Sequence, residues 1–499
     1  MTAPCATLAA VTDVDPSSLG PRDPSAPALT ADDLARLTGG RLLARSGRPI
    51  RGAAVDSRAV EPGQVFVALP GERTDGHAFI ADAVARGATA AIVTRPVPEP
   101  AALGDVSVVR VVDGLAALAA LATGWRQRFE PLVVGVTGSI AKTSTKEAVA
   151  AVLGRRFRTL RSEGNQNNEI GLPLTVLRLG PEHEAAVFEM GMYVGGEIAE
   201  LARIARPRIG VVTAVQPVHL SRIGSIEAIE AAKGELVEAL PRDGTAVLNA
   251  DDRIVRRMAR RTVARVLTYG FDDDADVSAE AIESAGLAGM RFTLRANGGR
   301  QAVAMPTLGR LSVHNALAAA AVGVAAGLSL REVAAGLSSG WSAPHRAQLV
   351  SAGDVTIVDD SYNASPRSVV AALDLLAGLP GRRGAILGEM LELGDASEEG
   401  HRMVGEAAAR SVDWLVAIGR GAAPIAAGAV DAGMDPARVS VAPDQDAVVA
   451  TLPPRLRAGD VVLVKASRGI GLDRLVESLR VELTSGGRGP GPTGQGIRR

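Results

Sequence analysis

The chain contains a single cysteine, Cys5, among its 499 residues. One cysteine excludes a disulfide within the chain and a zinc site built from several cysteines. Aromatic residues make up 3% of the sequence and hydrophobic residues 47%, so the interior must be mainly aliphatic. No stretch approaches the ~18 apolar residues of a membrane helix, and the N-terminus lacks the regions of a signal peptide. We therefore expect a cytoplasmic protein without membrane insertion.

Excess charge is also absent, because the formal net charge is −1 at pH 7. A chain without a basic excess lacks the positive charge that attracts nucleic acid. Lysine is scarce among the 54 basic residues, and the only ones are Lys142, Lys146, Lys233 and Lys465. Arginine replaces lysine as a surface cation but not as a compact charge or a neutral amine. We therefore interpret three of them as site residues and Lys146 as an ordinary surface lysine.

The length favours about three domains, at roughly 100–200 residues each. Short Val/Ile/Leu strands alternate with Ala-rich helical stretches, which is typical of α/β layers. Expected strands include residues 131–135, 186–189, 209–215 and 355–359, with a helical run near 315–326. We predict three α/β domains at 29–126, 127–341 and 342–484, between a disordered leader, 1–28, and a disordered tail, 485–499.

The segment after the strand 131–135 has the form of a phosphate loop, ending in Gly138-Ser139-Ile140-Ala141-Lys142-Thr143-Ser144. Backbone N–H groups at such a helix N-terminus bind phosphate, while the lysine reaches the β- and γ-phosphates and the threonine hydroxyl binds Mg²⁺. Val136 and Ala141 stand where the strict pattern has glycines, so an ordinary strand–turn–helix is the alternative. We predict that Ala141 has relaxed to a negative φ.

Three further residues follow expected strands or lie on a predicted helix of the same domain. Glu189 ends an apolar strand, at the sheet edge where ligands bind and where a carboxylate suits Mg²⁺. His219 follows the strand 209–215, and Lys233 lies on a predicted helix. Taken singly, each has an ordinary explanation: a capping or paired Glu, a packed His and a surface Lys.

Several long segments resemble the Mur peptide ligases, the ATP-dependent amino-acid ligases of peptidoglycan synthesis. Val55–Leu69, continuing to His77, is similar to their N-terminal domain. Glu163–Pro173, Asp359–Pro366 and Gly388–Gly394 resemble the member that joins D-alanyl-D-alanine to UDP-N-acetylmuramoyl-tripeptide. The resemblance spans about Leu29 to Leu483. It implies a UDP-sugar-binding N-terminal domain, a central P-loop ATPase-like domain and a C-terminal Rossmann-like domain.

The resemblance also implies roles for single residues. Lys142, Glu189, His219 and Lys233 match catalytic positions, and the Mg²⁺-binding positions are Thr143, Glu189, His219 and a carbamylated Lys233. ATP contacts are implied for Gly138–Ser144, Asn315, Arg346 and Asp360. Substrate contacts are implied for Ser57, Arg58, Asn165, Asn168, Tyr362 and Asn363. The segment Leu248–Asp252 is also family-like but receives no role.

The resemblance implies an enzyme in which ATP activates the tripeptide carboxylate as an acyl phosphate, which D-alanyl-D-alanine then attacks, and a monomer. One alternative is a sibling ligase that adds the third amino acid, or a ligase for another glutamate-like or peptide substrate. The chain has no Asp-Asn-Pro-Arg sequence of the kind that the diamino-acid-adding sibling uses. Met192-Tyr193-Val194 and Ala214 depart from the family pattern near the site. A second alternative is a non-catalytic nucleotide-binding scaffold with a decayed phosphate loop.

Overall fold

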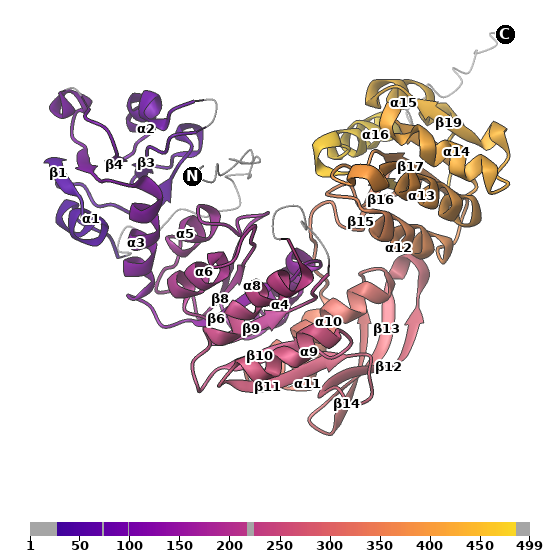
Figure 1. The fold of residues 1–499 in the computed structure, drawn as a ribbon, viewed down its shortest axis with the longest axis horizontal. Coiled ribbons are helices and arrows are strands. Elements are labelled where there is room, and N and C mark those ends of the chain that lie inside the picture. The colour runs from indigo at the N-terminus through magenta and orange to yellow at the C-terminus, as the bar shows by residue number, and fades with distance from the viewer. Residues whose placement is uncertain (1–26, 72–73, 98, 217–223, 486–499) are drawn as a thin grey trace, which may run out of the picture. The chain divides into compact units, whose positions relative to one another are not determined.

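The computed structural model describes residues 27–71, 74–97, 99–216 and 224–485. The predicted leader, 1–28, and tail, 485–499, therefore lie almost entirely outside the described residues, and so does His219. Two compact units divide the chain: Met1–Glu280 with Thr293–Val303 and His314–Ser339, and Ala281–Phe292 with Ala304–Val313 and Gly340–Arg499. The described residues form three sheets flanked by helices, which confirms the predicted α/β class (Figure 1).

The N-terminal sheet has the strand order β1-β5-β4-β3-β2. Its strands pair in parallel, except that β1 is antiparallel to β5. The strands are β1 (Arg41–Ala44), β2 (Ala53–Ala54), β3 (Val65–Val67), β4 (Ala90–Val93) and β5 (Ser107–Arg110), and the helices are α1 (Ala31–Thr38), α2 (Ile80–Ala85) and α3 (Gly114–Arg126). The Asp113 carboxylate accepts hydrogen bonds from the first N–H groups of α3, which fixes where that helix begins.

The central sheet has the order β14-β13-β12-β11-β10-β9-β6-β8-β7. From β7 to β12 neighbouring strands are parallel. Its strands are β6 (Leu132–Thr137), β7 (Thr159–Arg161), β8 (Ala185–Glu189), β9 (Ile209–Val212), β10 (Thr245–Asn249), β11 (Arg265–Gly270), β12 (Val277–Ser284), β13 (Met290–Ala296) and β14 (Gly299–Met305). Its helices are α4 (Lys142–Leu153), α5 (Gly171–Val176), α6 (Glu197–Ala205), α8 (Ile226–Glu238), α9 (Arg253–Arg257), α10 (Gly309–Ala325) and α11 (Leu330–Ser338).

The C-terminal sheet has the order β15-β16-β20-β17-β18-β19 and is parallel except for the antiparallel edge pair β15–β16. Its strands are β15 (Gln348–Ala352), β16 (Val355–Asp359), β17 (Arg383–Gly388), β18 (Trp414–Ile418), β19 (Val439–Ala442) and β20 (Val461–Lys465). The helices are α12 (Pro366–Ala377), α13 (Ser397–Ser411), α14 (Ala423–Asp431), α15 (Gln445–Thr451) and α16 (Asp473–Ser485). A mostly parallel sheet covered by helices is the predicted Rossmann-like arrangement.

Two boundaries differ from the predictions. The strand predicted at 209–215 ends at Val212, because the chain turns there and the Thr213 hydroxyl donates to the carbonyl of Ile140 at 2.6 Å. The helix predicted near 315–326 begins earlier, at Gly309. No helix of the described residues is long and apolar enough to cross a membrane.

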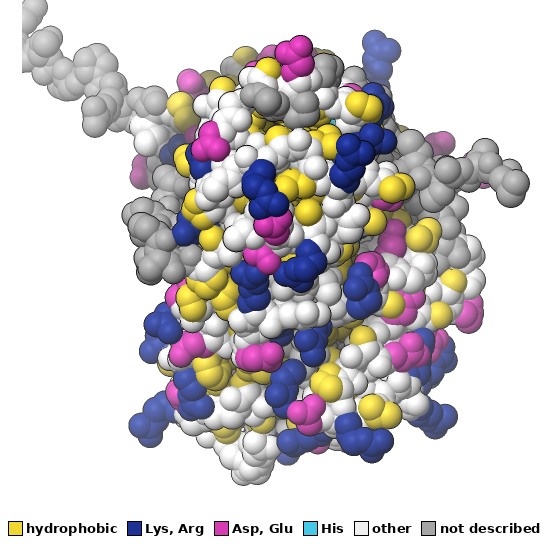
Figure 2. Space-filling view, turned by 90° about the vertical axis from the view of Figure 1, so that its left-hand side faces the viewer, with side chains coloured by type: hydrophobic (Ala, Val, Ile, Leu, Met, Phe, Trp, Pro, Cys, Tyr) yellow, Lys and Arg dark blue, Asp and Glu magenta, His cyan; other side chains and the backbone are white. Residues whose placement is uncertain are grey.

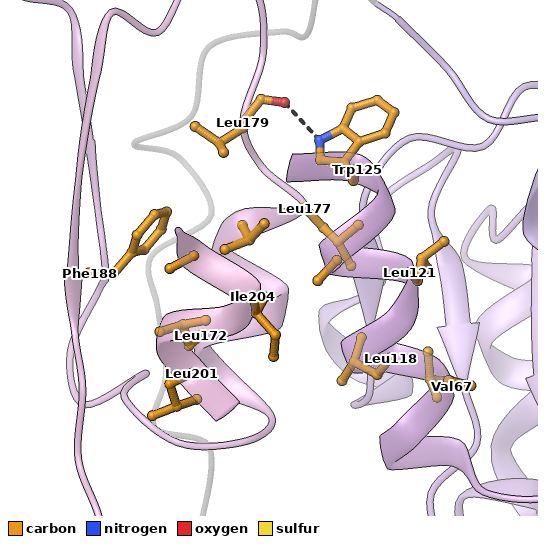
Figure 3. Packing of buried hydrophobic residues seen from close by; sticks show 14 of the residues in the cluster. Val67, Leu118, Leu121, Trp125, Leu172, Leu177, Leu179, Phe188, Leu201 and Ile204 are labelled. Carbon is orange, nitrogen blue, oxygen red and sulfur yellow. Dashed lines mark hydrogen bonds between the residues drawn. The ribbon is translucent and has the colours of Figure 1, made fainter. Parts of the chain in front are cut away.

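The N-terminal and central sheets share one hydrophobic core, and helix α3 contributes side chains to it (Figure 3). Leu118, Leu121 and Trp125 of α3 belong to the same buried cluster as Leu172 of α5 and Leu201 of α6. The Trp125 indole N–H donates to the carbonyl of Leu179 at 3.0 Å, so the one polar atom of this large side chain is satisfied. The first compact unit therefore contains the N-terminal sheet and most of the central region, whereas Ala281–Phe292 and Ala304–Val313 belong to the second unit.

The surface cations are arginines. None of the four lysines is exposed: Lys142 is half-buried, and Lys146, Lys233 and Lys465 are buried. The prediction that Lys146 lies on the surface is wrong, since its exposed fraction is 0%. On the face shown in Figure 2, basic side chains are interspersed with acidic ones, as the near-neutral net charge suggests.

Candidate functional site

The predicted phosphate loop leaves the end of β6 and enters α4. Gly138 has φ +150°, and a Cβ at this position would collide with the Thr213 hydroxyl, so a side chain would push the loop away from the end of β9. The Ser139 N–H donates to the carbonyl of Ala214 at 2.8 Å. The turn after β9 therefore holds the loop, and both lie at the carboxyl edge of the parallel sheet, where ligands bind.

Lys142 opens α4, and its ammonium donates to the carbonyl of Gly138 at 2.8 Å, folding back over the loop. Thr143, the next residue, is buried, with an exposed fraction of 7%. Ala141 has φ 65° and ψ 2°, so the prediction of a negative φ is wrong. The left-handed conformation turns the chain into α4, and alanine pays about 1 kcal/mol or more for a conformation that glycine adopts freely.

Glu189 ends β8 with an exposed fraction of 2%. Its Oε1 accepts a hydrogen bond from the Asn167 side-chain amide at 2.8 Å. Its Oε2 is buried and has no hydrogen-bond partner among the described residues. Leaving a buried carboxylate oxygen unsatisfied is costly, so an orphaned oxygen at the sheet's ligand edge fits a cation that the protein is built to receive.

Lys233 lies on α8 with an exposed fraction of 4%. No ion pair or hydrogen bond joins its ammonium to another described residue. Burial, together with the positive charge of Lys142, lowers the pKa of Lys233 to about 7. A buried lysine near neutrality exists largely as the free amine above that pH, which is the form that reacts as a nucleophile.

A metal site at this edge would combine Thr143, Glu189, Lys233 and His219. The position of His219 is not described, but the segment before it is tied to the phosphate loop, because Gln216 N–H donates to the Ser139 hydroxyl at 2.9 Å. Among the described residues, no three His, Cys, Asp or Glu side chains gather as a metal cluster. The donor set fits Mg²⁺ through the orphaned Glu189 oxygen and, if Lys233 is carbamylated, a second anionic oxygen pair.

The family-like segment Leu248–Asp252 received no role from its sequence, but it connects the strand ends. The Asn249 side-chain amide donates to the carbonyl of Thr213 at 2.7 Å, and its Oδ1 lies 3.2 Å from His314 Nε2. Asp252 caps α9 and accepts a hydrogen bond from Val215 N–H at 2.8 Å. The signal that could have revealed these roles is a polar run directly after a buried strand.

Asn315 lies on α10 and is buried, and its Oδ1 accepts a hydrogen bond from the Thr145 hydroxyl at 3.3 Å. This contact places the predicted adenine-binding residue beside α4. Two predicted substrate residues lie in the loop before α5: Asn165 is exposed, and Asn168 Oδ1 accepts a hydrogen bond from the N–H of Gly171, the first residue of α5, at 2.9 Å.

Ser57 and Arg58, predicted at the UDP-sugar side, lie in a short turn after β2. Ser57 is buried, and the Arg58 guanidinium pairs with Asp56 at 2.6 Å. That pairing holds the pKa of the Asp56 carboxyl below its usual range. The Arg58 side chain is 80% exposed.

The C-terminal unit gathers its predicted residues at the carboxyl ends of β16 and β20. The Lys465 ammonium pairs with Asp360 Oδ2 at 2.6 Å and donates to the carbonyl of Asn363 at 2.8 Å. The Arg346 guanidinium lies over the Tyr362 ring, 3.9 Å from its centroid. The Arg468 guanidinium lies near the same ring at 5.5 Å, and this residue received no role from the sequence.

Three family models match the chain along most of its length. They describe a Mur ligase family catalytic domain at residues 49–126, a Mur ligase middle domain at 136–323 and a Mur ligase glutamate ligase domain at 345–468.

Curated relatives are similar over nearly their whole length. The chain is 40% identical to the UDP-N-acetylmuramoyl-tripeptide--D-alanyl-D-alanine ligase of Mycobacterium tuberculosis, covering 92% of this chain and 99% of that protein. The ligase of the same name from Bacillus subtilis is 36% identical over 86% of this chain and 93% of its own length.

Solved structures agree. A crystal structure of MurF from Acinetobacter baumannii matches with a TM-score of 0.84 and 30% identity, covering 91% of this chain and 99% of that one. The MurF ligase of Thermotoga maritima in complex with ADP matches with a TM-score of 0.75 and 30% identity, covering 87% of this chain and 98% of that one.

Proposed function

The chain belongs to the Mur ligase family, and we propose that within it the chain joins D-alanyl-D-alanine to UDP-N-acetylmuramoyl-tripeptide at the expense of ATP. The observation that carries this proposal is the similarity to ligases of that activity along 99% of the Mycobacterium tuberculosis protein. The reaction belongs to the synthesis of peptidoglycan precursors in the cytoplasm.

The tripeptide's C-terminal carboxylate takes the γ-phosphoryl group of ATP, which gives an acyl phosphate and ADP. The free amine of D-alanyl-D-alanine then attacks the acyl carbon. The tetrahedral intermediate loses phosphate, the attacking nitrogen loses a proton, and the amide bond remains. Lys142 and the N–H groups at the start of α4 neutralise and orient the phosphates, which is the protein's main contribution to phosphoryl transfer.

Mg²⁺ would be held by Thr143, the free oxygen of Glu189, His219 and the carbamate of Lys233. When bound, it would supply positive charge to the phosphate oxygens. Two observations support this assignment: the buried Glu189 Oε2 has no partner among the residues described, and the pKa of the Lys233 amine is lowered. A neutral amine can capture CO₂, whereas the guanidinium of an arginine in its place could not.

The remaining residues bind the organic groups. Asn315, Arg346 and Asp360 contact the nucleotide, with Gly138–Ser144 around its phosphates. Ser57, Arg58, Asn165 and Asn168 face the UDP-sugar substrate, and Tyr362 and Asn363 face the incoming dipeptide. The domains span residues 29–126, 127–341 and 342–484, and the protein acts as a monomer.

Product formation tests the proposal. Purified protein is mixed with ATP, Mg²⁺, UDP-N-acetylmuramoyl-tripeptide and D-alanyl-D-alanine, and the amide product is detected by mass spectrometry together with released phosphate. We expect product only when all four are present, and loss of product in Lys142→Ala. Product with a single amino acid but not with the dipeptide would indicate a sibling ligase. Nucleotide binding without any product would indicate a scaffold.

A further inference from the structure

Lys146 lies one turn beyond the phosphate loop on α4, and its side chain is completely buried. A lysine is rarely fully buried unless its charge is paired and its donors are satisfied. Sequence alone suggested an ordinary surface residue, so its burial in a chain with four lysines requires a structural reason.

The Lys146 ammonium has three acceptors. It donates to the carbonyl of Ser162 at 2.6 Å, lies 3.4 Å from the carbonyl of Gly164, and pairs with Glu147 Oε1 at 3.0 Å. Glu147 also pairs with Arg161 at 2.7 Å, so the Glu147 carboxylate is shared between two cations. Three acceptors around one nitrogen suit the three donors of an ammonium, whereas an arginine would present a planar fork.

The segment that Lys146 holds contacts Glu189 at two points. The Ser162 hydroxyl accepts a hydrogen bond from the Glu189 backbone N–H at 3.2 Å. The Asn167 side-chain amide donates to Glu189 Oε1 at 2.8 Å, and the Asn167 carbonyl accepts from Gly191 N–H at 2.7 Å. Together these contacts fix both the backbone and the carboxylate of Glu189, while Oε2 has no hydrogen-bond partner in the part of the chain that the structure describes.

The same helix carries the phosphate loop's polar residues. Thr143 lies three residues before Lys146 and Lys142 four, so all three share the first turns of α4. Residues three and four apart lie on the same face of a helix. The Lys146 contacts therefore tie the helix that presents Thr143 to the segment that orients Glu189.

We propose that Lys146 is a positioning residue for Glu189: it holds residues 162–167 against α4, so that the Glu189 carboxylate keeps one oxygen on Asn167 and offers the other to the metal ion. This inference rests on the metal site of the proposed function. It assigns to Lys146 a role that acts through Ser162 and Asn167 and involves no contact with substrate. Partners of this kind, which orient a metal ligand, typically change metal affinity about 10–100-fold when removed.

The test is the affinity for Mn²⁺, used as a paramagnetic substitute for Mg²⁺, measured by electron paramagnetic resonance in the presence of ADP. Lys146→Met keeps most of the unbranched side chain and removes the donors, and we expect it to weaken Mn²⁺ binding about tenfold or more. Wild-type protein that binds no Mn²⁺ would refute the metal site itself. Wild-type binding that Lys146→Met leaves unchanged would refute this inference alone.

Arg126→Met is the matched control. Arg126 is also a buried cation that donates to backbone carbonyls, those of Ala205 at 2.8 Å and Phe129 at 2.6 Å, and these hydrogen bonds do not involve Glu189 or α4. We expect both variants to lower the midpoint of thermal unfolding and only Lys146→Met to weaken Mn²⁺ binding. Equal Mn²⁺ losses in both would show a general structural effect and overturn the proposal.

Two milder variants test the path if Lys146→Met fails to fold. Ser162→Ala removes the hydroxyl that accepts the hydrogen bond from Glu189 N–H. Asn167→Ala removes the amide that donates to Glu189 Oε1. Each should weaken Mn²⁺ binding by severalfold in a protein whose unfolding midpoint is close to that of the wild type. If neither variant changes Mn²⁺ affinity, the segment does not position Glu189, whatever the behaviour of Lys146→Met.

Discussion

The Arg346 guanidinium lies over the Tyr362 ring, 3.9 Å from its centroid, in the C-terminal unit. The two residues received different roles from the sequence, Arg346 at the nucleotide and Tyr362 at the dipeptide. Their stacking joins the two roles, since a shift of the ring on binding the dipeptide would also move the guanidinium. A stacked cation contributes about 0.5–1 kcal/mol at exposed sites and more when desolvated.

Tyr362→Leu should therefore lower kcat/KM for D-alanyl-D-alanine about fivefold, the equivalent of about 1 kcal/mol. Tyr362→Phe keeps the ring face and should stay within about twofold of wild type. Steady-state kinetics with the dipeptide as the varied substrate measures both. Equal losses in the two variants would assign the effect to the hydroxyl group and contradict the stacking argument.

Ala141→Gly should stabilise the protein by up to about 1 kcal/mol, because glycine adopts a φ of 65° without the strain that alanine suffers there. The measurement is the denaturant-dependent free energy of unfolding. Ala150→Gly, at a helical position of the same α4, is the control and should destabilise by about 0.5–1 kcal/mol. A destabilising Ala141→Gly would show that the left-handed turn is not strained.

Lys233→Arg should be nearly as inactive as Lys233→Ala, because arginine keeps the charge but cannot form a carbamate. Formate or acetate should partly restore Lys233→Ala by supplying the missing anion, and should not restore Lys233→Arg, where the side chain still fills the space. A ¹³C NMR signal from ¹³CO₂ should identify the carbamate in wild type and weaken below pH about 7, where the amine is protonated. Substantial activity in Lys233→Arg would refute the carbamate.

His345 should make stability depend on pH. The Asp359 carboxylate, 2.7 Å from Nδ1, raises the pKa of His345 above its usual value of 6.5. The charged pair therefore stabilises the fold fully below pH 6.5, and this contribution is lost as pH rises through the raised pKa. Asparagine tolerates the positive φ of 60° at this position. His345→Asn should therefore remove the part of the fall in unfolding temperature that the pair causes as pH rises above 6.5. An identical fall in wild type and variant would contradict the pairing.

Part of the fold could be predicted because it rests on local pattern. The strands β6, β8, β16 and β18 are buried along nearly their whole length, so they appear in the sequence as short apolar runs. The strand β13, by contrast, alternates between buried and exposed residues and was not predicted. Its sequence carries no continuous apolar signal, because one of its faces stays partly exposed.

The candidate site likewise contains features that local sequence predicts and features that depend on distant contacts. The α/β class, the phosphate loop and the order of the family's motifs could all be predicted, because they depend on residues adjacent in the chain. Three features could not be predicted in this way: Lys146 is buried, Ala141 is left-handed, and one oxygen of Glu189 has no partner within the described ranges. Each of these depends on groups brought together from separate strands and loops, and burial and hydrogen bonding are set by those distant neighbours rather than by local sequence.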